Sequence, residues 1–166
     1  MPRTLLTLLA AVFILLAGSS AGVAALAANG GLPPESAIFF AQEFAEDARA
    51  ALTANPADRL DFALTVLERR TQDLARLLNQ PGQGMGLRAA NRALNRAALA
   101  YAALSPQQQL ANDVDLLRKV ALLTDALDLL RQLDAHPAVE LESLAAKVAA
   151  LRSLVQAGPP PTESLL

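Results

Sequence analysis

The side chains that could carry acid, base or metal chemistry are one histidine and a few acidic groups. His136 stands alone before Pro137, and neither a Glu-x-x-His metal motif nor a Gly-x-Ser-x-Gly nucleophile elbow accompanies it. Zinc and di-iron sites need several converging ligands, so this histidine is not expected to bind a metal or to catalyse. The chain has no cysteine, which excludes disulfides, iron–sulfur clusters and thiolate zinc sites.

Acidic residues recur at helical spacing in two places, Glu43/Glu46/Asp47 and Asp125/Asp128. A solvated helix face explains this spacing, with a divalent-ion or acid–base role as the alternative. The run Gly-Gln-Gly-Met-Gly lacks both the preceding strand and the following Lys-Ser/Thr of a phosphate-binding loop. The sequence therefore predicts a protein that is not an enzyme and that uses no cofactor and no metal.

A cluster of positive charge is the one feature that suggests a binding role. Four arginines and no acidic residue fall between Arg76 and Asn112. Three of them follow at i, i+4 and i+8 on one face of a predicted helix, and a leucine shares their sector: Arg88, Arg92, Arg96 and Leu99. We call these four residues the arginine stripe. Either it is a solvated face that pairs with acids of a neighbouring helix, or it binds an acidic partner or anionic head groups.

The N-terminal leader, residues 1–28, determines where the rest of the chain functions. The apolar run Leu5–Ala17 behind Arg3 has the length of a signal-peptide core, and Ala25–Ala27 offers a small-x-small cleavage site. The uncharged run Leu5–Ala28 is also long enough to cross about 30 Å of hydrocarbon as a retained anchor. Positive charge before the run and acidic residues after it place the body outside the cytoplasm in both cases. A core helix of a cytoplasmic protein is the remaining alternative.

The body of the chain contains regularly placed helix-breaking segments, as expected for a helical protein. Residues 29–34 are a Gly- and Pro-containing tether, residues 35–157 the predicted domain and residues 158–166 a predicted disordered tail. Breaks at "TANP", "NQPGQGMG", "SPQQ" and "DAHP" divide the domain into about five predicted helices. They run from near Pro34 to about Thr53, from Pro56, over 87–104, from Pro106 and after Pro137.

Two of these helices begin with recognisable caps. Asn55 precedes Pro56, and Ser105-Pro106 is followed by Gln108 in a capping-box arrangement. The helix after Ser105 carries two apolar stripes, which predicts a central helix covered on two sides: Leu116, Val120, Leu123, Leu127 and Leu130; and Leu122, Ala126, Leu129 and Leu133.

The composition favours a helical bundle. Hydrophobic residues make up 53% of the chain but aromatic residues only 4%, so alanine and leucine must form the core. No convincing period-2 strand is present. We therefore expect an all-α bundle behind the leader. The formal net charge of −2 makes nucleic acid an improbable partner.

The first two predicted helices carry a longer pattern. Its residues are Pro34, Ser36, Phe39, Glu46, Arg49, Ala51, Leu52, Thr53, Pro56, Arg59, Glu68, Arg69 and Arg70. Over about residues 32–78 the chain resembles a family of uncharacterised bacterial extracytoplasmic helical domains that follow a single export or membrane segment. The family usually has tyrosine in place of Phe39 and lysine in place of Gln42. The resemblance implies a fold and a compartment, and it implies no active site.

Together these features predict a non-enzymatic interaction or sensory module of a bacterial envelope. The partner would be a protein or a membrane surface, and the sequence leaves the oligomeric state open. The alternative is an accessory subunit of a membrane complex, or a carrier that holds a small ligand between helices. The Glu68-Arg69-Arg70 run is expected to be structural, on an exposed face with local pairs such as Arg69–Asp73.

Overall fold

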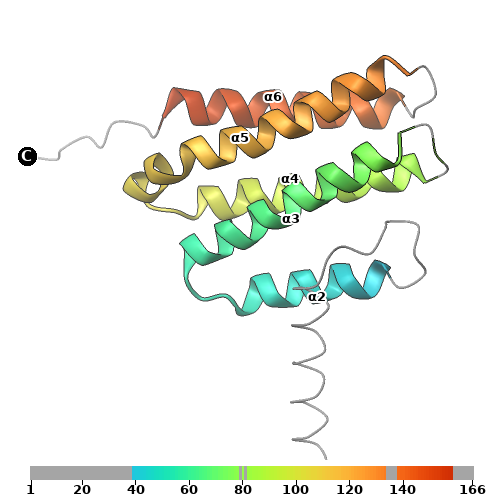
Figure 1. The fold of residues 1–166 in the computed structure, drawn as a ribbon. Helices are drawn as coiled ribbons and strands as arrows, with labels where there is room; N and C mark the ends of the chain where they lie inside the picture. Colours follow the sequence, from blue (N-terminus) through green and yellow to red (C-terminus); the bar gives the residue numbers. More distant parts are fainter. Residues whose placement is uncertain (1–38, 79, 81, 134–137, 159–166) are drawn as a thin grey trace, which may run out of the picture. The chain divides into compact units, whose positions relative to one another are not determined.

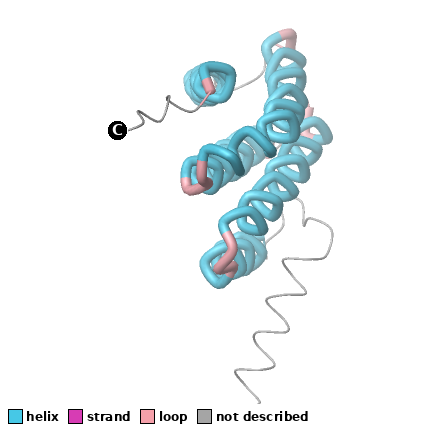
Figure 2. The backbone as a smooth tube through the Cα atoms, turned by 90° about the vertical axis from the view of Figure 1, so that its left-hand side faces the viewer, coloured by secondary structure: helices cyan, strands magenta, loops and turns pink. Residues whose placement is uncertain are grey.

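The computed structural model describes residues 39–78, 80, 82–133 and 138–158. The secondary structure of these residues is entirely helical: α2 (Phe39–Leu52), α3 (Pro56–Arg76), α4 (Gln83–Ala102), α5 (Pro106–Arg131) and α6 (Ala138–Ala157). Figure 2 shows helices and short loops, and no strand, in the part of the chain that is described. The expected all-α fold is therefore confirmed for these residues.

Several expectations fall on residues outside this description. These are the leader over 1–28, the tether over 29–34, His136 and the tail from residue 159 onward. Among the helices that are described, none combines the length and the apolar character that a membrane crossing requires.

The described residues fall into two compact units. The first is represented by α2 and the second begins at Thr53 and contains α3 to α6. Within α2, Gln42 Nε2 donates a hydrogen bond to Glu46 Oε1 over 3.1 Å, and Arg49 lies in the last turn, where the helix dipole favours a cation. The end expected near Thr53 agrees with the observed end at Leu52, whereas the start expected near Pro34 lies outside the described residues.

Both predicted caps are present in the second unit. Asn55 Oδ1 accepts a hydrogen bond from the Ala57 backbone N–H over 3.0 Å, and Pro56 opens α3. At α5, the Gln108 backbone N–H donates to Ser105 Oγ over 3.4 Å, while the Ser105 backbone N–H donates to Gln108 Oε1 over 3.1 Å. These bonds satisfy helix-terminal donors that have no partner within the helix.

The start of α4 differs from the expectation. The sequence predicted a break through Gly86 and a helix from Leu87, but α4 begins at Gln83. Gly82 turns the chain with a φ of 100°, a left-handed conformation that favours glycine. Gly86 lies inside the helix because it faces α3: a Cβ atom there would lie 3.1 Å from Leu77 Cδ1 and 3.3 Å from Leu74 Cδ1. This glycine allows close helix packing, and it does not end the helix.

Helices α3 to α6 form two antiparallel hairpins packed on one another. Each helix runs opposite to the one before it (Figure 1). Contacts join α3 to α4 and α5 to α6 within the hairpins, and they join α3 to α5 and α4 to α6 between them. The packing between the hairpins is therefore parallel, and the short connection after α4 leads diagonally across the bundle to α5.

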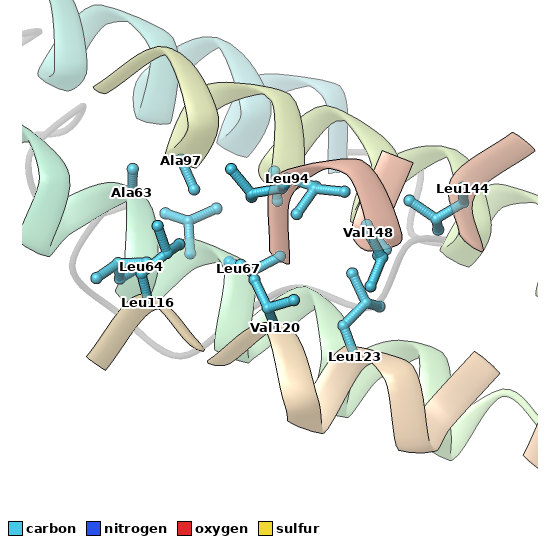
Figure 3. Close-up of a cluster of buried hydrophobic side chains, with 14 of the residues drawn as sticks. Ala63, Leu64, Leu67, Leu94, Ala97, Leu116, Val120, Leu123, Leu144 and Val148 are labelled. Carbon is cyan, nitrogen blue, oxygen red and sulfur yellow. The ribbon is translucent and has the colours of Figure 1, made fainter. Parts of the chain in front are cut away.

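The core lies among these four helices and consists mainly of leucine and alanine. Leu67, Leu94 and Leu123 meet near its centre (Figure 3), and each is at most 2% exposed. Ala63 and Ala97 let α3 and α4 approach closely. Burial of one leucine contributes about 1.5–3 kcal/mol, so several such residues can hold a bundle without disulfides.

Helix α5 is covered less completely than predicted. Its first stripe is buried, with Leu116, Val120 and Leu123 at 0% exposure. In the second stripe Ala126 is buried, but Leu122 is 42% and Leu129 48% exposed. The expectation of a central helix covered along both stripes was therefore wrong. Helix α5 packs against α3 and α6, and its remaining side is an outer face with apolar residues.

Candidate interaction surfaces

The arginine stripe lies on the outer side of α4, and α6 borders it. Arg88 is exposed, and its Nη1 lies 3.3 Å from Glu140 Oε1 on α6. Arg92 is exposed and Arg96 half-buried, and each of them also takes part in a polar or charged interaction. Leu99 is 73% exposed. The four residues predicted as a binding surface thus share one side of one helix.

The two interpretations of the stripe apply to different residues. Arg88 pairs with an acid of a neighbouring helix, as the structural interpretation requires. On the same seam Lys147 Nζ of α6 donates to Asn91 Oδ1 over 2.8 Å. Arg92 and Leu99 are exposed, as the binding interpretation requires. No acidic residue occurs within α4, so its outer side presents positive charge together with two exposed large apolar side chains, Met85 and Leu99.

A groove between α5 and α6 is a second candidate site. Its volume is about 450 Å³, within the range of small-ligand sites. Its floor includes Leu127 and Val148, and small side chains of α6 such as Ala145 and Ala149 leave the space open. The groove adjoins the outer surface of the bundle, so it differs from an enclosed core cavity.

Charged side chains line this groove on both helices. Arg131 donates from Nε and Nη2 to the two carboxylate oxygens of Glu142, both over 3.0 Å, and from Nη1 to Asp128 over 2.9 Å. The bonds to Glu142, then that to Asp128, raise the pKa of Arg131 above its usual value. Arg152 also lines the groove and makes no ion pair with any other described residue.

The Glu68-Arg69-Arg70 run is less exposed than predicted. Arg70 and Asp73 are 1% and 4% exposed, and Arg70 Nη1 lies 3.1 Å from Asp73 Oδ2. Glu68 reaches across to Lys119 of α5. The expectation of an exposed face was therefore wrong for Arg70, and the expectation of local pairs was wrong for Glu68.

The sequence held a signal for this burial. The series Ala63, Leu67, Arg70 and Leu74 alternates steps of four and three residues, so Arg70 occupies a position of the apolar seam. A buried charge of this kind requires a partner, and Asp73 provides it.

Tyr101 joins α4 to α5 through a hydrogen bond. Its hydroxyl donates to Asp113 Oδ1 over 2.6 Å, and the side chain is 3% exposed. Burial, and then the hydrogen bond to Asp113, raises the pKa of Tyr101 above the usual 10.0. The tyrosine therefore remains a neutral donor, and its role in this geometry is structural.

Metal-binding geometry is absent from the described residues. No group of three or more histidine, aspartate or glutamate side chains lies close enough to hold an ion there. Of the pair Asp125/Asp128, Asp128 accepts from Arg131. His136 lies outside the described residues.

Comparison of the chain with protein-family models, with curated proteins and with solved structures gave no match. The resemblance over about residues 32–78 to an extracytoplasmic domain family stays a prediction from the sequence.

Proposed function

We propose that this protein is a non-enzymatic interaction module of a bacterial envelope, and that the arginine stripe on α4 binds an acidic protein partner. The observation that supports this most directly is the outer side of α4, where exposed Arg92 lies with Leu99, which is 73% exposed. A charged surface steers a partner of opposite sign, and an exposed apolar side chain adds contact area once the two have met.

Compartment is a further part of the proposal. The leader exports the body, either as an uncleaved anchor or as a signal peptide cut after Ala27. Fractionation of cells expressing the full chain, with the intact mass of the product, separates these forms. An uncut chain in the cytoplasm would contradict the proposal.

The binding test compares two arginines of the same bundle. Arg92→Glu alters the stripe, and Arg76→Glu makes the same charge change at the exposed end of α3, outside the stripe and outside the groove. Arg92→Glu should reduce capture of a partner from envelope extracts, whereas Arg76→Glu should not. Binding should weaken as salt rises, because exposed charges are screened over about 8–10 Å.

Membrane lipid is the alternative target of the same stripe. Vesicles of phosphatidylglycerol and of phosphatidylcholine test it: binding to the anionic vesicles that Arg92→Glu removes would point to lipid, not protein. Equal partner capture and equal vesicle binding by both variants would leave the stripe without a binding role.

The groove between α5 and α6 favours a second candidate function, carriage of a small ligand. Its volume of about 450 Å³ suits a ligand with an apolar body, and Arg152 would attract an anionic end. Binding of an anionic apolar dye such as anilinonaphthalene sulfonate tests this. Ala149→Phe, which fills the groove, should abolish dye binding, whereas the same change at Ala150 on the exposed side of α6 should not.

A further inference from the structure

The outer face of α5 exposes more apolar surface than a solvated helix needs. We define the α5 outer face by six residues: Leu110, Val114, Arg118, Leu122, Asp125 and Leu129. Its four apolar members are between 42% and 79% exposed. At about 100° per residue all six fall within an arc of about 120°. They therefore form one continuous side of a 26-residue helix.

Arg118 and Asp125, near the middle of this arc, have opposite signs, and exposed Asp128 at the edge of the arc pairs with Arg131 on its own helix. Arg118 is 67% exposed and pairs only locally, with Asp115 one turn before it. Asp125 is exposed and makes no ion pair with any residue in the described part of the chain. The face thus offers one available acid and one cation whose present partner lies on its own helix.

We propose that the α5 outer face binds the same face of a second copy of this chain in an antiparallel pair. When the two helices cross between Ala121 and Leu122, Val114 of each copy lies opposite Leu129 of the other. In the same register Arg118 lies opposite Asp125, and the two-fold axis repeats this pair.

Charge complementarity is what selects a second copy as the partner. One register aligns the apolar residues with one another and also brings each cation to an acid, which is the property of an isologous interface. A parallel pairing would put Arg118 beside Arg118 and Asp125 beside Asp125. Helix α5 is about 39 Å long, which is long enough to form a specific protein–protein interface along its outer face.

Cysteine cross-linking tests the register, because the chain contains no cysteine of its own. Full-length chain carrying both Val114→Cys and Leu129→Cys is expressed in cells, oxidised with copper phenanthroline and run on a non-reducing gel. We expect a disulfide-linked dimer from the double variant and none from either single variant. In the antiparallel pair the two copies of residue 114 lie about 22 Å apart along the helix, beyond disulfide reach.

Charge reversal tests the pairing by an independent route. In the double-cysteine background, Arg118→Asp or Asp125→Arg alone places like charges together twice and should lower the cross-linked fraction about fivefold. The combined change Arg118→Asp/Asp125→Arg restores opposite charges and should recover the dimer. Circular dichroism of each variant checks that the fold is retained.

Other results of these two experiments would contradict the register or the whole proposal. A dimer from Val114→Cys alone would mean a parallel pairing and would overturn the register. No dimer from the double-cysteine variant, or no recovery in the combined charge reversal, would overturn the proposal. None of these outcomes bears on the proposed binding role of the arginine stripe, which lies on α4.

Discussion

The outer sides of α4 and α5 belong to one bundle and carry opposite kinds of surface. Helix α4 exposes arginines around two large apolar residues, Met85 and Leu99, with no acidic residue in the helix. The α5 outer face exposes four large apolar residues around Arg118 and Asp125. The first surface favours a partner of opposite charge, and the second favours a copy of itself. Both helices bury leucines on their inner sides, so the core does not distinguish them and the outer sides do.

The largest expected difference in stability is between substitutions at two adjacent residues of α5, one on its inner side and one on its outer side. Leu123 is fully buried, whereas Leu122 is 42% exposed. Leu123→Asp places an unpaired carboxylate in the core, at a cost of several kcal/mol against a total stability of about 5–15 kcal/mol, and should unfold the bundle. Leu122→Asp should change the free energy of unfolding by less than about 1 kcal/mol. Thermal melting followed by circular dichroism distinguishes the two, and equal melting would mean that α5 has no inner side.

A smaller difference is expected between a buried arginine of α3 and its half-buried neighbour. Arg70→Ala leaves the buried Asp73 carboxylate with only the more distant Arg76, 3.7 Å away, as an arginine partner, which should cost about 3 kcal/mol. Arg69→Ala, beside it on a half-buried position, should cost less than about 1 kcal/mol. Urea unfolding of both variants measures the difference. A similar small loss in both would show that the Arg70–Asp73 pair contributes little net stability.

Loss of the hydrogen bond that joins α4 to α5 should reduce stability by an intermediate amount, and this reduction should depend on pH. Tyr101→Phe removes the hydrogen bond to Asp113, at a cost of about 1.5 kcal/mol. The raised pKa of Tyr101 means that its stabilisation is complete below pH 10 and declines as pH rises above it, because the unfolded chain loses the proton first. The melting temperatures of parent and variant should therefore converge above pH 10. A constant difference would contradict a protonated donor.

The smallest effects are expected within the arginine stripe. Arg88→Ala removes an exposed pair with Glu140 and should cost less than about 1 kcal/mol. Arg92→Ala should cost no more, because Arg92 is exposed. Urea titrations in low and high salt test this, since salt should reduce the Arg88 effect. A loss of several kcal/mol at either position would make the stripe part of the folded framework and would weaken the case for a binding surface.

Local sequence signals were sufficient to predict much of the bundle. The cap residues Asn55 and Ser105 form the bonds that their types and positions predicted. Leu141, Leu144 and Val148 of α6 recur at steps of three and four residues, and all three are buried. These features depend on side chains within one or two turns, so the sequence contains all the information they need.

What the sequence by itself determined is therefore the helical class and the two caps at Asn55 and Ser105. Only the tertiary structure decided which of two apolar stripes on α5 is covered, because that depends on where α3 and α6 lie. It also decided that Gly86 packs inside α4 against Leu74 and Leu77, and that Arg70 is buried with Asp73. Helical spacing identifies residues that share a side of one helix. Burial depends on neighbouring helices from distant parts of the chain, and no local pattern specifies their positions.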